Sequence, residues 1–561
     1  MTFEEIPLRI PNLTIVEKKA KKFLEEFQNA TSAKEQAKVI RKFDKYYFNI
    51  QSDLTVISIR YTLNTQDPEY QEAQAKADEL IPEIESILNI PFAKAMLSSP
   101  YYEELKKIFG EHFMNIYRAK VESFDDRIVE DLQEENRLLT QYNRVVSAAK
   151  IPFRGEIYNL SQLAKFTEDL DRETRKEASK AYWKFFEEHN EELGKIYDDL
   201  VHVRTKMAHK LGYKNFVELG YLRLGRTDYG AEEVKKYRDQ IYHDVVPVTK
   251  KLFRQQAKRL EIKNPKYYDY NLTFKDGNPT PIGNRDTLVL KAQKMYDEMS
   301  AETGPFFRFM CKHHLLDLDA RAGKSGGGYM TYLSRYEFPF VFANFNGTQG
   351  DVEVLTHEIG HSYQGYCARK IFPQVLQSPT YEACEIHSMS MEFFAWPWMK
   401  DFFGDQEKKF LFAHLSNAVT FLPYGVAVDE FQHFVYENPD VTHQERLAKW
   451  REIEKKYLPH KEYRKGSFLD LGGFWMKQRH IFESPFYYID YTLAQVVAFE
   501  FLIEMQKDYK KAWKKYNRLC NLGGKYPFTL LLKKAHLANP FIECTVKKII
   551  RPIERKLKSI L

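Results

Sequence analysis

The order of apolar and polar residues along most of the chain has the period of an α-helix. Between Val16 and Phe27, apolar residues recur three and four positions apart among lysines and glutamates. Such a helix packs its apolar face on a core and leaves its charged face in solvent. We therefore predict a mainly α protein, with further long helices at about 71–88, 127–149, 172–211, 231–259, 286–303 and 444–457.

Two segments interrupt the helical pattern. Residues 264–284 contain three prolines and the turn signal Asp276-Gly277, which predicts a loop or a short hairpin between helical halves. From Gly323 onward, glycines are followed by aromatic and β-branched residues, which favour one or two short strands ending near Phe345. We predict a small β-sheet at about 323–346. Its bare glycine backbone at Gly326, Gly327 and Gly328 could approach a ligand closely.

Composition narrows the class of protein. The 561 residues are 43% hydrophobic, which is enough for a large core. The net charge of +6 is small and basic residues alternate with acidic ones, so we expect no nucleic-acid partner. No apolar run reaches the roughly 18 uncharged residues of a membrane span. The acidic N-terminus lacks the features of a signal peptide, and five cysteines without a CxxC pair suit reduced thiols, so we predict a cytoplasmic protein without a membrane partner.

The segment after the predicted sheet carries a metal-binding pattern. Thr348, with Asp351 three residues later, resembles a helix N-cap, so a helix should run over about 349–368. On it, His357 and His361 lie one turn apart on the same face, where both imidazoles can bind one zinc ion. Glu358 is one step round the helix, beside the open position of the metal, where it can accept a proton from water.

A catalytic zinc ion normally has a third protein ligand. The metzincin extension is excluded because Gln364 and Cys367 replace its glycine and histidine. The Cys367 thiol is itself a conceivable ligand, but it lies nearly three turns along the same helix from His357, which disfavours it. Downstream, a second predicted helix can pack against the first. It presents Glu382, Glu385 and Glu392 on nearly the same side, and this spacing leaves Glu382 and Glu385 as rival ligands.

His357-Glu-Ile-Gly-His361 followed by Glu385-Ile-His-Ser-Met-Ser-Met-Glu392 resembles the thimet oligopeptidase and oligoendopeptidase F family of zinc peptidases. In appearance the chain is closest to the bacterial Pz-peptidase-like oligoendopeptidases. The resemblance is strong over 323–398 and again over 480–491. It implies that Glu385 is the third zinc ligand and that Glu392 orients a metal-bound histidine. An aminopeptidase pattern would instead require a glutamate at position 380, which is Thr380.

The same resemblance assigns further residues. The family's oxyanion donors fit His480, Tyr488 and Tyr491, with the register of the tyrosines left open because Glu483-Ser-Pro-Phe replaces a glycine-rich turn. The glycines 326–328 match the family's substrate-binding loop. Ala343 and Asn344 match an edge strand that would align the peptide backbone. The fold implied is a two-lobed helical metallopeptidase with a deep central channel, divided here into an N-terminal helical lobe at 1–170 and a catalytic lobe at 171–561.

These features together predict a zinc-dependent endopeptidase with one ion per chain. Its substrates would be short oligopeptides, with collagen-derived peptides suggested only by the resemblance. Two alternatives remain at this point: a carboxypeptidase-like zinc exopeptidase, and an inactive zinc-containing peptide-binding protein. The sequence leaves the oligomeric state open.

Overall fold

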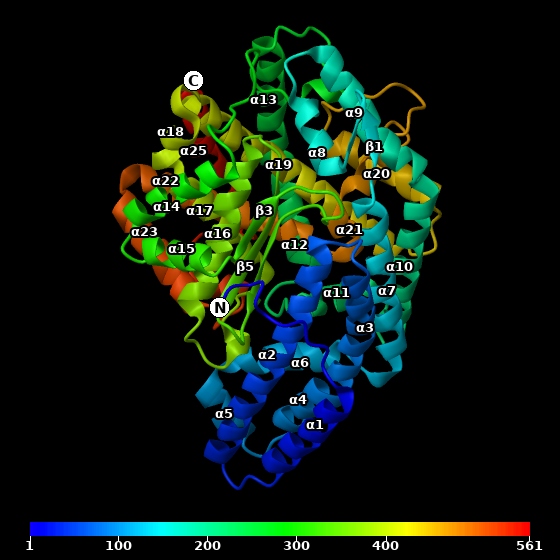
Figure 1. Cartoon of the computed structure of the whole chain (residues 1–561), viewed down its shortest axis with the longest axis vertical. Coiled ribbons are helices and arrows are strands. Elements are labelled where there is room, and N and C mark those ends of the chain that lie inside the picture. Colours follow the sequence, from blue (N-terminus) through cyan, green and yellow to red (C-terminus); the bar gives the residue numbers. More distant parts are fainter.

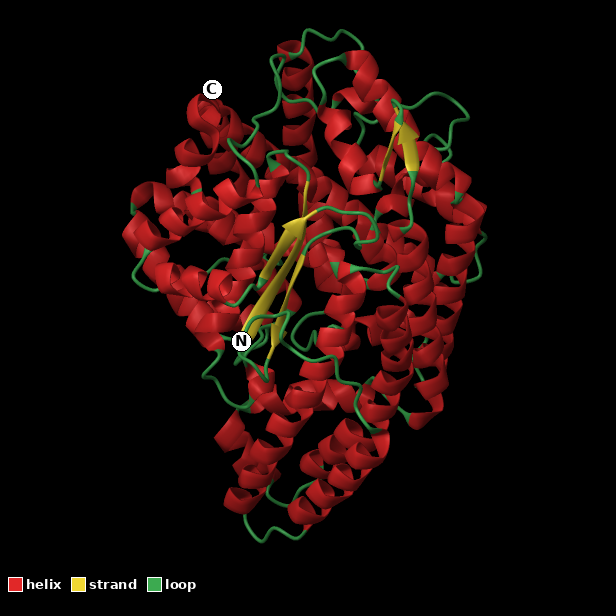
Figure 2. Ribbon diagram, viewed as in Figure 1, coloured by secondary structure: helices red, strands yellow, loops and turns green.

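The computed structural model describes residues 1–561 and is mainly helical (Figures 1 and 2). The N-terminal half contains α1 (Leu13–Gln28), α2 (Ala33–Leu63), α3 (Pro68–Ile84), α4 (Ile90–Leu97), α5 (Tyr102–Phe109), α6 (Glu111–Glu122), α7 (Val129–Ser147), β1 (Ile151–Phe153), β2 (Glu156–Tyr158), α8 (Leu160–Ala164), α9 (Arg172–Glu188), α10 (Asn190–Lys210), α11 (Phe216–Arg223), α12 (Ala231–Gln240) and α13 (Val246–Arg259). These elements follow the predicted helical pattern closely.

The second half holds the small central sheet and the helices around it (Figure 1). Its elements are α14 (Arg285–Met299), α15 (Thr303–Lys312), β3 (Leu316–Asp319), β4 (Tyr329–Leu333), β5 (Phe338–Phe345), α16 (Gly350–Ala368), α17 (Tyr381–Phe394), α18 (Met399–Phe403), α19 (Glu407–Glu437), α20 (His443–Tyr457), α21 (Arg479–Glu483), α22 (Tyr488–Lys507), α23 (Tyr509–Leu522), α24 (Phe528–Ala535) and α25 (Thr545–Ile560).

Local signals explain both the agreement and the differences. In α1 the buried residues Val16, Ala20 and Phe27 keep helical spacing, and the Asn12 side chain accepts a hydrogen bond from the Ile15 N–H as the N-cap. The helix predicted at 172–211 is two helices, because the backbone leaves the helix at His189. Residues 264–284 form a loop with one short 3₁₀ turn and no strand.

The central sheet has the strand order β3-β5-β4. Strand β5 runs parallel to β3 and antiparallel to β4, so Phe342 pairs with Asp317 on one side and with Tyr329 on the other. The strand that was predicted as an edge, with Ala343 and Asn344, is thus central only over Phe338–Phe342, where it pairs with β4. The end of β5, up to Phe345, extends beyond the last pair with β4, which is itself an edge strand. The sequence pattern missed β3, because its two leucines alternate with two aspartates and the strand lies before the glycines.

Helices α16 and α17 pack closely because of one glycine. A Cβ built at Gly360 would lie 2.6 Å from the Ser388 Cα, so no larger side chain fits at this crossing without moving a backbone. Gly360 is the fourth residue of the His357–His361 motif and has no chemical role in it. The glycine instead brings α17, with its glutamates, against the face of α16 that carries the histidines.

Two hydrophobic cores run through the molecule. A core of 24 buried residues lies almost entirely within α1 to α6, the blue helices at the lower end of Figure 1, while a core of 115 buried residues extends from Phe3 to Leu557. Because the larger core includes residues on both sides of position 170, the division into lobes at 1–170 and 171–561 stays a prediction, as does the channel between them.

One stretch, Tyr381–Glu437, is long and apolar enough by composition to cross a membrane. In the structure, 72% of its most apolar window is buried inside the protein, and the stretch is broken into α17, α18 and α19. Burial of this kind is typical of core helices.

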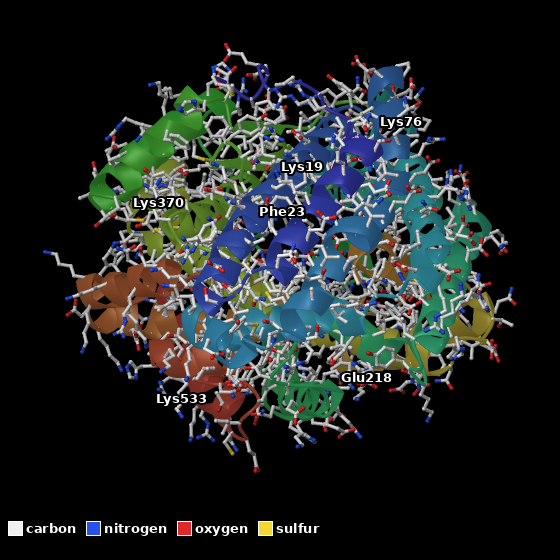
Figure 3. All side chains as sticks on the ribbon, turned by 90° about the horizontal axis from the view of Figure 1, so that it is seen from below. Lys19, Phe23, Lys76, Glu218, Lys370 and Lys533 are labelled. Carbon is white, nitrogen blue, oxygen red and sulfur yellow. The ribbon has the colours of Figure 1, made fainter.

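Charged side chains are dispersed over the surface. Figure 3 labels the exposed residues Lys19 on α1 and Lys76 on α3 in the upper part of the view from below, and Lys533 on α24 and Glu218 on α11 in its lower part. This distribution agrees with the mixed charge pattern of the sequence.

Candidate metal centre

Helix α16 carries the motif histidines, and it begins one residue later than predicted, at Gly350. Thr348 does not cap it; the Thr348 hydroxyl donates to the Asn346 side chain. The Asp351 carboxylate instead accepts hydrogen bonds from the backbone N–H groups of Asn346 and Gly347, both at 2.9 Å. Asp351 therefore fixes the loop that joins β5 to the helix.

His357, His361 and Glu385 bring three ligand atoms together, all within 4.8 Å of one another. The Glu385 Oε2 atom lies 3.2 Å from His357 Nε2 and 3.3 Å from His361 Nε2. Two ligands that each lie 2.0–2.1 Å from a tetrahedral zinc ion are separated by about 3.3 Å, so this donor set fits such an ion. Burial opposes ionisation of Glu385, but His361 and His357 outweigh it and hold its pKa well below the usual value.

The rival ligands lie elsewhere. Glu382 is fully buried on the same helix, outside the donor group, where burial, partly offset by the charge of Arg226, raises its pKa. The Cys367 thiol contacts the Asn517 side chain at 3.9 Å. Of the candidates that the sequence left open, only Glu385 shares a site with the two histidines.

Glu392 joins His357 to a second histidine. One Glu392 oxygen lies 2.7 Å from His357 Nδ1 and the other 2.7 Å from His414 Nε2. The Trp396 indole N–H donates to His414 Nδ1, so His414 in its neutral form carries its proton on Nε2 and donates it to Glu392. His414 was missed by sequence reasoning, because it lies on α19 and no spacing rule connects it with the motif.

The glycine turn lies beside Glu358. A Cβ at Gly328 would be 3.4 Å from Glu358 Oε1, so the turn backbone passes in contact with this carboxylate. The Glu358 Oε2 atom is buried and has no hydrogen-bond partner in the protein. Burial raises the pKa of the Glu358 carboxyl, although the two histidines act in the opposite direction.

Ala343 and Asn344 act on the glycine turn. Ala343 is fully buried, and its carbonyl accepts a hydrogen bond from Lys324 Nζ. The Asn344 amide donates to the carbonyls of Ser325 and Gly327 at 2.9 and 2.8 Å. Ala343 and Asn344 lie beyond the last residue pair between β5 and β4, and through these contacts they shape the turn that faces Glu358. Their alignment of a substrate backbone stays a prediction.

His480 belongs to a hydrogen-bonded series that ends at a tyrosine. The Tyr424 hydroxyl donates to Gln478 Oε1, and Gln478 Nε2 lies 2.8 Å from His480 Nδ1. His480 Nε2 then lies 3.1 Å from the Tyr491 hydroxyl. Burial lowers the pKa of His480 to about 4, so the ring is neutral at pH 7 with its proton on Nε2.

The tyrosines of this segment occupy different positions. The Tyr487 hydroxyl donates to Glu385 Oε1, a contact that the sequence reasoning missed because it could not fix the register of adjacent tyrosines. Tyr488 has its ring 5.0 Å from that of His480 but makes no hydrogen bond through its hydroxyl. Burial, with the charge of Glu385, raises the pKa of Tyr491 well above the usual value, so its phenol keeps its proton.

Two imidazoles and a carboxylate around one point, with an unpartnered glutamate beside them, define a site of the metallopeptidase class. The comparisons with known proteins agree. Residues 3–124 match the Peptidase M3 N-terminal domain, and residues 294–549 match Peptidase family M3. The chain belongs to peptidase family M3.

Its relatives include oligoendopeptidases. A solved structure of Pz peptidase A with an inhibitor is 46% identical, with a TM-score of 0.98 and 99% of both chains covered. Oligopeptidase PepF of Bacillus subtilis is 21% identical over 83% of this chain and 70% of its own length. The chromosomal oligoendopeptidase F of Lactococcus lactis is 22% identical over 64% of this chain and 61% of its own length. This chain thus spans less than two thirds of the Lactococcus protein.

Proposed function

We propose that the protein is a zinc-dependent endopeptidase that hydrolyses internal bonds of short oligopeptides. The observation that carries the proposal is the group of three donor atoms with the unpartnered Glu358 oxygen beside it. Membership in family M3 supports a peptidase, and the named oligoendopeptidase relatives favour cleavage of short peptides.

His357, His361 and Glu385 would hold the ion, one per chain. Bound zinc would supply a Lewis acid that polarises a peptide carbonyl and lowers the pKa of water. Glu392 accepts the Nδ1 proton of His357 and so directs the other ring nitrogen toward the Glu385 carboxylate. The Trp396–His414 pair fixes Glu392 in turn.

Glu358 would take a proton from the attacking water and later deliver it to the leaving amine. Tyr491 would donate its phenol proton to the oxyanion that forms at the carbonyl. His480 donates to the Tyr491 oxygen, which leaves the phenol proton directed away from His480. A neutral His480 therefore acts as a positioning residue for Tyr491, and it cannot serve as a cationic donor.

The substrate backbone would pair with β4. This strand is an edge of the sheet, and its outer side makes no hydrogen bond to another segment of the protein. An extended peptide could add to it by β-augmentation, which reads backbone shape more than sequence. The glycine turn at 326–328 would let the peptide pass close to Glu358. A cytoplasmic location and collagen-derived substrates remain parts of this proposal.

A quenched fluorescent pentapeptide with both termini blocked tests the proposal. We expect the purified protein to cleave it internally, to lose that activity in a chelator, and to regain it with about one equivalent of zinc. Mass spectrometry of the products gives the cut sites. Cleavage only of peptides with a free C-terminus would indicate a carboxypeptidase, and metal binding without cleavage would indicate a peptide-binding protein.

Replacing Tyr491 with phenylalanine should lower kcat by about 10²-fold and leave KM nearly unchanged, because a lost oxyanion donor affects the transition state more than the bound substrate. Tyr488→Phe is the matched control, since the Tyr488 hydroxyl has no partner that directs it. Steady-state kinetics of both variants show which of the two tyrosines donates to the oxyanion. A larger loss in Tyr488→Phe, or an effect confined to KM, would contradict the role of Tyr491.

A further inference from the structure

A cavity of about 380 Å³ lies between α9, α13, α19 and the segment that precedes α21. Aromatic side chains wall it, among them Trp183, Phe253 and Phe474. Three cationic side chains also line it, Arg259, Lys461 and Lys477, and no aspartate or glutamate does. The cavity therefore combines an apolar wall with an excess of positive charge.

Lys461 and Lys477 have no ion-pair or hydrogen-bond partner for their ammonium groups. Both instead lie over the ring of Phe474, with Nζ 3.3 and 4.5 Å from the ring centroid. Glu454, whose charge acts on both lysines, is already bonded to the Tyr463 hydroxyl at 2.8 Å and to Arg451 at 3.0 Å. Arg259 is also engaged, because its Nε donates to the Thr273 carbonyl.

Two partly buried ammonium groups with no carboxylate in hydrogen-bond contact cost free energy, which the charge of Glu454 offsets only in part, and a bound anion would complete the site. Burial lowers the pKa of Lys461 to about 7 and that of Lys477 to about 8. A bound carboxylate would act in the opposite direction and stabilise both charges.

The cavity and the candidate metal centre share helix α19. This helix contributes His414 to the Glu392 network and, two and six residues further on, Ser416 and Thr420 to the cavity. Phe421 on the same helix has its ring 5.7 Å from that of Tyr488, which faces His480. Lys477 is three residues before His480, so their Cα atoms are at most about 11 Å apart. A peptide bound at both places would span these neighbouring segments in an extended form.

We propose that Lys461 and Lys477 bind the C-terminal carboxylate of the peptide substrate, while the aromatic wall accepts its last side chain. The proposal rests on the proposed peptidase function and deepens it. A terminal carboxylate fits better than an acidic side chain, because the cavity offers apolar contacts beside the two ammonium groups. The site would favour peptides whose end lies a few residues from the cleaved bond.

Pairs of fluorescent peptides that differ only in a C-terminal carboxylate or carboxamide test this proposal. We expect a series of such pairs, from four to ten residues, to contain a length at which the wild-type protein prefers the acid by about tenfold or more in KM, because hydrogen bonds to charged groups are the strong ones. The double variant Lys461→Gln/Lys477→Gln should lose this preference and cleave the amide as before. Lys465→Gln, which changes an exposed lysine nearby, is the matched control.

Binding of the same peptides to Glu358→Gln protein, measured by fluorescence anisotropy, separates the two proposals. Preference for the acid in binding supports the carboxylate site even where no peptide is cleaved. Equal binding of acid and amide at every length overturns it, as does a preference that survives in the double variant. An amidated peptide that ends in glutamate also overturns the proposal if it binds as tightly as the peptide acid, because the cavity would then bind a side-chain carboxylate.

Discussion

Replacing Glu358 with glutamine is expected to leave metal binding intact and to lower peptide cleavage by about 10² to 10⁴-fold. Glutamine has nearly the same shape, but its amide cannot accept the proton of the attacking water. This substitution separates the chemical step from metal binding, because Glu358 lies beside the three donor atoms but is not one of them. Cleavage rates of a blocked peptide, with metal content measured on the same samples, provide the readout.

Glu353→Gln is the control for that experiment. Glu353 lies on the same helix, makes its hydrogen bond with Gln349 at 3.1 Å and is not one of the three donors, although its charge acts on His414. Glu353→Gln should therefore lose far less activity than Glu358→Gln. Undiminished cleavage in Glu358→Gln would remove Glu358 from the role of base, and an equal loss in both variants would point to a general effect on α16.

The sequence predicted those parts of the site that repeat at a fixed spacing. His357, Glu358 and His361 follow from one helical turn, whereas the roles of Glu385 and Glu392, two turns apart, were implied by the family resemblance. The helical fold could also be predicted from the sequence, because amphipathic helix faces recur along most of the chain. Each of these inferences depends on residues less than ten positions apart.

The remaining parts depend on tertiary contacts. No local pattern links His414 to Glu392, or Tyr487 to Glu385 across 102 positions. The sheet shows the same limit: the apolar run of β5 fits a strand, but only the pairing with β3 and β4 reveals that it is central. Lys461 and Lys477 look like ordinary surface lysines in the sequence. Only the tertiary structure shows that they line a cavity without an aspartate or glutamate.

The second large effect is expected from replacing the third zinc ligand, for which Glu385 and Glu382 are the candidates. Glu385→Ala should lose bound zinc, by more than the ten- to hundredfold drop in affinity that loss of an outer-shell partner causes. It removes one of three ligands and leaves two imidazoles that cannot neutralise the ion. Glu382→Ala should keep its zinc, because Glu382 faces Arg226 and Asp490 rather than the histidines. Metal analysis after dialysis of both variants measures this difference.

Both glutamates are buried on the same helix, so loss of folding must be separated from loss of a ligand. Thermal unfolding of each variant in a chelator compares the metal-free proteins, and unfolding with added zinc shows which of them the ion stabilises. Zinc should raise the Tm of the wild type and of Glu382→Ala but not of Glu385→Ala. The reverse order would place the third ligand at Glu382 and would contradict the assignment that the 3.2 and 3.3 Å contacts of Glu385 support.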